Sequence, residues 1–270
     1  MAAVLLTAST VWAAPKEAWQ AGVSFYTESG DYGTDSKATT TYIPFSLRRY
    51  FDPGDLTLTI PFISVTSEGQ VVVVSGTPNR RGRSSVTTST ANAKVTHSGL
   101  GDMILKGRYY LLEDHGAIPA VDAVAHVKFP TASRADGLGT GEFDEGIGLE
   151  FTKTVAQRYL AMADVGYTFI GSPPDESYYN QWHYSFGPGY YIIPGKLLGS
   201  VAYEEYAALV DGEPNPIDLL FSAQYFPTRH VRLDAGVQAG LSRSAADYGI
   251  NVGIHFKFQS FHLPEGILNT

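Results

Sequence analysis

Nearly every segment after residue 17 alternates apolar and polar residues with a period of two. This period is typical of β-strands, in which successive side chains point to opposite faces of a sheet. The stretch Val231–Leu241 is the clearest example, since its apolar side chains share one face while Arg232, Asp234 and Gln238 share the other. The two faces must therefore meet different environments. A soluble sandwich would bury the apolar face in a core, whereas a membrane barrel would turn it to lipid.

Composition favours a chain that faces two solvents. Charged residues make up 17% and aromatic residues 13% of the 270 residues, and a soluble enzyme of this length usually carries more charge and a helical part. The absence of Cys excludes disulfides, cysteine nucleophiles and cysteine zinc sites. The net charge of -8 argues against nucleic acid as a partner, because binding phosphates requires clustered Lys and Arg.

About twelve alternating segments can be counted, each near the ~10 residues with which a tilted strand crosses a bilayer. They begin near Trp19, Ala38, Asp55, Gly101, Pro119, Phe143, Tyr159, Tyr179, Leu197, Ile217, Val231 and Tyr248. Short turns alternate with longer loops along the chain, and aromatic residues gather at the segment ends, as they do at membrane interfaces. The sequence therefore predicts an all-β fold, a closed antiparallel transmembrane β-barrel with short periplasmic turns and longer extracellular loops. Its predicted location is the outer membrane of a Gram-negative bacterium, with lipid as a partner.

The two ends of the chain are predicted to lie outside the barrel, which would span residues 15–258. Residues 1–14 are apolar and end in small residues, which resembles the core and cleavage region of a secretory signal peptide. The basic region expected before them is missing, so either the start is misassigned or the resemblance is accidental, and we favour a misassigned start. Residues 259–270 are predicted to form a C-terminal extension.

The longest predicted loop runs from about Thr66 to Ser98 and carries a basic tract, Arg80–Arg83, among Ser, Thr and Asn. We expect it to be extracellular. The basic tract could bind lipopolysaccharide phosphates, although a flexible, solvated loop is the interpretation that we favour.

Two motifs resemble a known family. Ser98–Tyr110 contains Gly-Leu-Gly-Asp followed by Gly and Tyr, and Lys128–Gly141 begins Lys-Phe-Pro-Thr and ends Gly-Thr-Gly. These stretches, with the strand that starts at Asp144, resemble the family of outer-membrane transporters named for the meta-pathway of phenol degradation. The resemblance implies passive or facilitated movement of small compounds, hydrophobic or aromatic ones among them, across the outer membrane.

The last predicted strand resembles the signal recognised by the barrel-assembly machinery. A polar residue, Asn251, is followed by Gly253 and then by Phe256 and Phe258. The resemblance implies that this machinery is a partner.

If the apolar face meets lipid, the other face lines a lumen. The residues predicted to line it are Arg48, Asp102, Lys106, Arg108, Asp122, His126, Lys128, Glu150, Asp164, His183, Glu204, Asp218, Arg232, Asp234, His255 and Lys257. Both signs of charge occur in similar numbers, which matches neither an anion pore nor a cation pore. We favour a narrow conduit for a small neutral or weakly polar solute. In the alternative, charges paired across the lumen close a structural or adhesion barrel.

An outer-membrane lipid-modifying enzyme is a further alternative. His183 and Ser185 share one strand face, but that face is the polar one, away from lipid, and the chain has no Gly-x-Ser-x-Gly motif. The seven His residues are scattered, without metal-ligand spacing. We therefore predict no catalysis, no metal and no cofactor.

Overall fold

The computed structural model describes residues 19–32, 34, 36–68, 71–74, 77–80 and 94–259. The predicted signal peptide, residues 81–83 of the basic tract and all but the first residue of the predicted extension lie outside these residues. No helix within the described part of the chain is long and apolar enough to cross a membrane.

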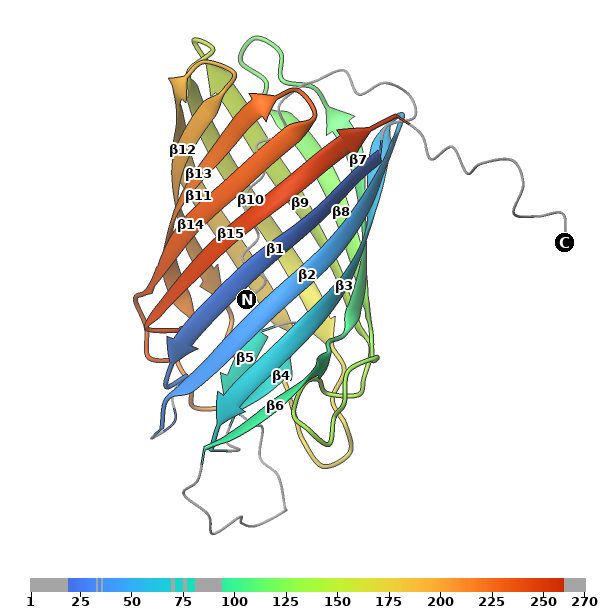
Figure 1. The fold of residues 1–270 in the computed structure, drawn as a ribbon, viewed down its shortest axis with the longest axis vertical. Coiled ribbons are helices and arrows are strands. Elements are labelled where there is room, and N and C mark those ends of the chain that lie inside the picture. Colours follow the sequence, from blue (N-terminus) through green and yellow to red (C-terminus); the bar gives the residue numbers. More distant parts are fainter. Residues whose placement is uncertain are drawn as a thin grey trace, which may run out of the picture.

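The described residues form β-strands joined by turns and loops (Figure 1). The strands are β1 (Trp19–Gly30), β2 (Ala38–Phe51), β3 (Gly54–Ser67), β4 (Val71–Val74), β5 (Thr77–Arg80), β6 (Val95–Leu100), β7 (Met103–Leu112), β8 (Ala120–Phe129), β9 (Asp144–Val155), β10 (Tyr159–Ile170), β11 (Gln181–Ile193), β12 (Leu197–Tyr206), β13 (Ile217–Thr228), β14 (Val231–Gly240) and β15 (Tyr248–Phe258).

One antiparallel sheet closes on itself as a barrel. Its strands pair with their neighbours along the chain, and β15 pairs with β1 from Trp19 opposite Phe258 to Ser29 opposite Tyr248. Strands β6 and β7 pair with opposite halves of β3, so they form one wall strand that is interrupted at Gly101 and Asp102. The 13 strands of this sheet are therefore 12 wall strands, which confirms the predicted closed barrel of about twelve.

The connections alternate in length, and this gives the barrel two different ends. We call one the turn end, where short connections such as 156–158 and 194–196 join neighbouring strands. The other is the loop end, where the longer connections 31–37, 68–94, 130–143, 171–180, 207–216 and 241–247 lie. Figure 1 shows the strands running obliquely between the two ends, as the strands of a closed barrel must.

The outer face of the barrel is apolar. In β14 the predicted alternation is observed, because Leu233 and Val237 are exposed while Asp234 and Gln238 are buried. Ile147, with 61% of its surface exposed, shows the same outward direction on β9. Such a continuous apolar surface is unfavourable in water and matches the lipid-facing band of a membrane barrel.

The connection between β3 and β6 differs in part from the loop that the sequence predicts. It contains the hairpin β4–β5, whose strands pair from Val71 opposite Arg80 to Val74 opposite Thr77. The side chains of Val72, Val73 and Val74 are all buried, so this part is not a solvated loop. Strands β3 and β6 also extend into the predicted loop, where Ser67 pairs with Val95.

Candidate functional site

Six charged side chains near the turn end form what we call the paired cluster: Arg48, Asp55, Lys106, Arg108, Asp122 and Glu150. They come from the neighbouring strands β2, β3, β7, β8 and β9. The set holds three cations and three carboxylates, so its formal charges cancel. A wall with balanced charges presents little net field to a solute.

Arg108 is at the centre of this cluster. Its guanidinium lies 2.7 Å from Glu150 Oε2, 3.4 Å from Asp55 Oδ2 and 3.8 Å from Asp122 Oδ2, and its side chain is 5% exposed. Lys106 Nζ lies 2.9 Å from the other Glu150 oxygen, Oε1. Each buried carboxylate therefore has a cation beside it, which offsets the cost of removing charges from water.

Asp55 is a member of the cluster that the lumen prediction missed. It lies 3.5 Å from Arg48 Nε, and it accepts a hydrogen bond of 2.8 Å from the Tyr110 hydroxyl. The sequence placed Asp55 at the start of a strand, beside a turn. Its alternation with Thr57 and Thr59, opposite in parity to Leu56 and Leu58, is the signal that would have assigned it to the inner face.

A second group, centred on Lys128, lies at the loop end. The Lys128 Nζ is fully buried, 3.1 Å from Asp102 Oδ2 and 3.0 Å from Asp144 Oδ2, and it donates a 3.2 Å hydrogen bond to Thr140. Asp102 sits at the break between β6 and β7 and also accepts a 2.9 Å hydrogen bond from the Ala132 N–H. The Gly-Asp motif thus anchors the 130–143 loop to the barrel wall.

A third group lies on β14 and β15. Asp234 is 2.8 Å from Arg232 Nε and 2.7 Å from His255 Nε2. Lys257 lies over the ring of Tyr50, 4.5 Å from its centroid. These four predicted residues therefore contact side chains on their own or nearby strands.

Three of the predicted wall residues are histidines, and none of their rings leaves room for a side chain on the strand beside it. A Cβ on Gly146 would lie 2.1 Å from the His126 ring, one on Gly166 would lie 2.3 Å from His183, and one on Gly22 would lie 2.1 Å from His255. Each glycine is the directly opposite neighbour of its histidine. Because glycine has no side chain, the rings lie flat against the wall instead of projecting across the barrel.

Three further carboxylates form what we call the carboxylate row: Asp164, Glu204 and Asp218. Asp164 lies opposite Ser185, Ser185 lies opposite Glu204, and Glu204 lies opposite Asp218, so the row crosses β10 to β13 on one face. Its partners among the described side chains are a hydroxyl, an imidazole and an amide: Ser185 donates to Asp164, His183 Nε2 lies 3.4 Å from Asp164, and Gln238 hydrogen-bonds to Asp218. Among the described residues, no Lys or Arg forms an ion pair with the row.

Ser185 and His183 both contact Asp164, and no hydrogen bond joins them to each other among the described contacts. This arrangement does not match a nucleophile held by its base. In the described part of the chain, no group of three or more His, Asp or Glu is placed to hold a metal ion.

The ion pairs of the inner face run along the wall. They join residues on one strand, on adjacent strands or on next-but-one strands, such as Lys106 on β7 and Glu150 on β9. Among the described residues, none joins opposite walls, as the alternative of a barrel closed by its charges would require. The function of these residues in lining a solute path stays a prediction.

The predicted assembly signal forms part of the strand that closes the barrel. Asn251 is buried opposite Tyr26, and Gly253 lies opposite Ser24. Phe256 faces outward with 49% exposure, and Phe258 pairs with Trp19 at the turn end. Recognition of this signal stays a prediction.

The β4–β5 hairpin lies within the outline of the barrel at the loop end (Figure 1). Val73 packs with Tyr26, Tyr42 and Ile63 from β1 to β3. Val72 and Val74 pack with a different cluster: Ile170 at the end of β10, Tyr178 and Leu209. Strand β4 therefore contacts two sides of the barrel and forms an apolar seal at this end.

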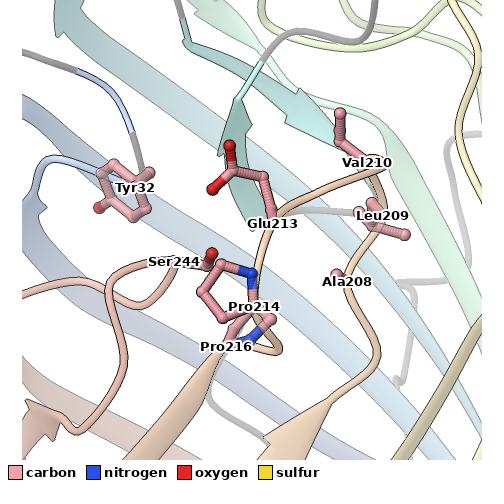
Figure 2. Close-up of a pocket in the computed structure, with 8 residues that line it drawn as sticks. All are labelled: Tyr32, Ala208, Leu209, Val210, Glu213, Pro214, Pro216 and Ser244. Atoms are coloured by element: carbon pink, nitrogen blue, oxygen red, sulfur yellow. The ribbon is translucent and has the colours of Figure 1, made fainter.

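A small, open pocket lies among the loops at the same end (Figure 2). Its lining residues are Tyr32, Ala208, Leu209, Val210, Glu213, Pro214, Pro216 and Ser244. Leu209 belongs both to this pocket and to the apolar seal. The pocket is thus lined mainly by residues of the loops, and its Tyr32 side chain lies beside Glu28 of the inner wall.

Comparison with known proteins supports the fold. A family model described as "Putative MetA-pathway of phenol degradation" matches residues 55–258, which is most of the chain. None of the curated proteins matches. An outer-membrane channel from Pseudomonas putida F1 has a similar structure, with a TM-score of 0.68 and 17% identity over 93% of this chain and 98% of that one.

The NanC porin is also similar, with a TM-score of 0.51 and 11% identity over 88% of this chain and 100% of that one. Likenesses at this identity show the fold, and the predicted closed β-barrel is confirmed.

Proposed function

Because this chain belongs to the MetA-pathway family of phenol degradation, we propose that it is an outer-membrane channel for passive movement of small solutes, hydrophobic or aromatic ones among them. The observation that carries the proposal is the direction of the ion pairs. Pairs that run along the wall, such as Arg108–Asp55 and Lys128–Asp144, neutralise charges without crossing the barrel. A barrel closed by its own charges would instead require ion pairs between opposite walls.

The inner surface also offers apolar contacts near the turn end. Leu160, Met162, Tyr191 and Leu198 form one buried cluster on β10, β11 and β12. This cluster has the same parity as Asp164 and Glu204 on its strands, so it belongs to the inner face. A wall that is partly charged and partly apolar suits a solute with an aromatic or aliphatic body.

The hairpin β4–β5 is proposed to restrict access from the loop end. Its valines contact both sides of the barrel and form the apolar seal. Solutes would therefore meet an apolar surface before the charged wall. This order favours hydrophobic compounds, because ions lose hydration at an apolar constriction.

Location and assembly follow from the same proposal. Residues 1–14 would direct export and be removed, and the barrel-assembly machinery would recognise the strand that contains Asn251, Gly253, Phe256 and Phe258. Lipid and lipopolysaccharide would contact the apolar outer face and the loop end. The channel needs no catalytic residue, metal or cofactor.

A barrel that serves only structure or adhesion is the second candidate. The buried side chains of the paired cluster favour it, since Arg108 and Asp122 are largely removed from solvent. The two candidates differ in whether solutes pass.

Liposome swelling distinguishes them. The full chain is expressed in a Gram-negative host, and the outer-membrane protein is checked for a heat-modifiable band and reconstituted in liposomes. We expect swelling with small neutral solutes such as glycerol and arabinose, at rates that fall as solute size rises. A heat-modifiable protein that gives no more swelling than empty liposomes would support the structural barrel.

A further inference from the structure

The carboxylate row gathers negative charge, and among the described residues no Lys or Arg forms an ion pair with it. On the inner face, Glu204 lies directly opposite Asp218, and Ser185 separates Glu204 from Asp164. Directly opposite side chains have Cβ atoms about 4.5–5.5 Å apart. Like charges placed opposite each other are destabilising. Both neighbouring carboxylates repel a negative charge on Glu204.

Among the three carboxylates of the row, Glu204 gives the clearest indication of a bound ligand. Its side chain is 2% exposed, and its Oε1 has no hydrogen-bond partner among the described residues. One Asp218 oxygen, Oδ1, is likewise without a partner in the described part of the chain, although Gln238 bonds to this carboxyl group. Buried acceptors without donors are costly, and native proteins contain few of them. A bound cation that carries N–H donors would satisfy both.

The surfaces on either side of the row are apolar or aromatic. One step toward the turn end, Met162, Ala202 and Leu220 occupy the same face of β10, β12 and β13, and all three are buried. One step toward the loop end, the rings of His183 and Tyr206 stack with centroids 5.3 Å apart. A compact hydrated metal ion would gain nothing from these surfaces, whereas an organic cation would.

We propose that the carboxylate row binds the ammonium group of a small amine whose apolar body lies against Met162, Ala202 and Leu220. The ammonium has three N–H donors for carboxylate oxygens that lack partners, and the ring of Tyr206 faces the same region. This inference rests on the proposed function, because the amine reaches the row through the lumen. It adds a preferred class of solute, a primary amine with an aromatic or aliphatic body.

Calorimetry on the purified protein in detergent tests binding directly. The probes are benzylamine, which is a cation at neutral pH, and benzyl alcohol, its neutral counterpart of similar shape. We expect benzylamine to bind more tightly than benzyl alcohol. The double variant Glu204→Gln with Asp218→Asn should bind benzylamine at least about tenfold more weakly, since hydrogen bonds to charged groups are lost.

Asp211→Asn is the matched control, because it removes one carboxylate from an exposed position in the 207–216 loop. It should leave benzylamine binding unchanged. Each variant is accepted as folded only if its band stays heat-modifiable, and Glu204→Gln alone replaces the double variant if that one fails to fold.

Single-channel current measured on the same samples separates this inference from the proposed function. The amine site would be overturned, and the channel kept, if current is observed but the two probes bind equally. The same holds if current is observed but the row variants do not weaken benzylamine binding. Benzylamine binding that depends on Glu204 without any current would overturn the channel and leave the site. Neither current nor binding would overturn both.

Discussion

The paired cluster and the carboxylate row both lie on the inner wall of the barrel, but they differ in whether cations lie beside their buried carboxylates. In the paired cluster, three cations face three carboxylates, and Arg108 alone contacts Asp55, Asp122 and Glu150. In the row, three carboxylates share one histidine, which contacts Asp164. Pairing of the first kind offsets the cost of burying charge, whereas carboxylates of the second kind are buried without a Lys or Arg beside them among the described residues. The comparison teaches that charge balance, rather than the presence of charge, separates the two parts of this wall.

The largest expected effect comes from breaking the paired cluster. Arg108→Met keeps much of the side-chain volume but leaves three buried carboxylates without their shared cation, so we expect the free energy of unfolding to fall by about 3–5 kcal/mol. Urea titration of the protein in lipid measures this. A loss below about 1 kcal/mol would show that the cluster does not depend on pairing.

The next effect concerns His183, the histidine that contacts the row. Gly166→Ala would place a Cβ 2.3 Å from the His183 ring, so the ring must move and its contact with Asp164 is lost. We expect a cost of about 1–3 kcal/mol from this overpacking.

Gly107→Ala is the matched control for Gly166→Ala. Its added Cβ would meet only Leu56 Cδ1, at 3.8 Å, and stability should change little. Equal losses of stability in the two variants would mean that the close packing of His183 against Gly166 does not cause the effect.

Glu204→Gln is expected to change stability less than Arg108→Met does, and in the opposite direction. Glu204→Gln removes one of two carboxylates that lie directly opposite each other, so we expect stability to stay the same or to rise by up to about 1 kcal/mol. The same urea titration applies. A loss comparable to that of Arg108→Met would show that Glu204 has a stabilising partner and would remove the distinction between the two regions.

The smallest effect comes from an ion pair at the turn end, between Asp114 in the turn that follows β7 and Lys153 on β9. Burial raises the pKa of Asp114, but hydrogen bonds from Lys153 and from the Thr154 N–H outweigh it and leave the pKa below its usual value. Since a lowered pKa stabilises the fold above the usual carboxyl pKa of about 3.9, this contribution is lost as pH falls through the folded-state value.

Asp114→Asn should therefore cost about 0.2–1 kcal/mol at pH 7 and nothing in strong acid. Unfolding titrations at both pH values measure the difference. A cost that does not vary with pH would assign the effect to packing of the turn.

The sequence predicts the barrel well because alternation is local. Strand β14, with Leu233 and Val237 outside and Asp234 and Gln238 inside, could be assigned from its own residues. The hairpin β4–β5 could not, because Val71–Val74 is a uniform apolar run with no alternation, set in a tract of Ser, Thr and Asn. Its burial depends on Tyr42 and Leu209, which are distant in the chain.

The inner wall was only partly predictable for a related reason. Parity placed Arg108 and Glu204 on one face but could not show which carboxylates have cations beside them. That difference depends on strand register, which puts Glu204 opposite Asp218 and Glu150 two strands from Lys106. The sequence therefore predicts which charged residues face inward, but it does not predict which carboxylates lie beside cations and which lie beside other carboxylates.

Single-channel recording in planar bilayers tests the central claim, that the wall is charge-paired along its surface and leaves a path that the β4–β5 hairpin restricts. The wild-type chain is compared with a variant in which residues 71–80 are replaced by a short Gly-Ser linker. The account predicts small stepwise currents for the wild type and larger steps for the variant. Absence of current from both proteins, each with a heat-modifiable band, would contradict it and show that the barrel is closed by its own wall.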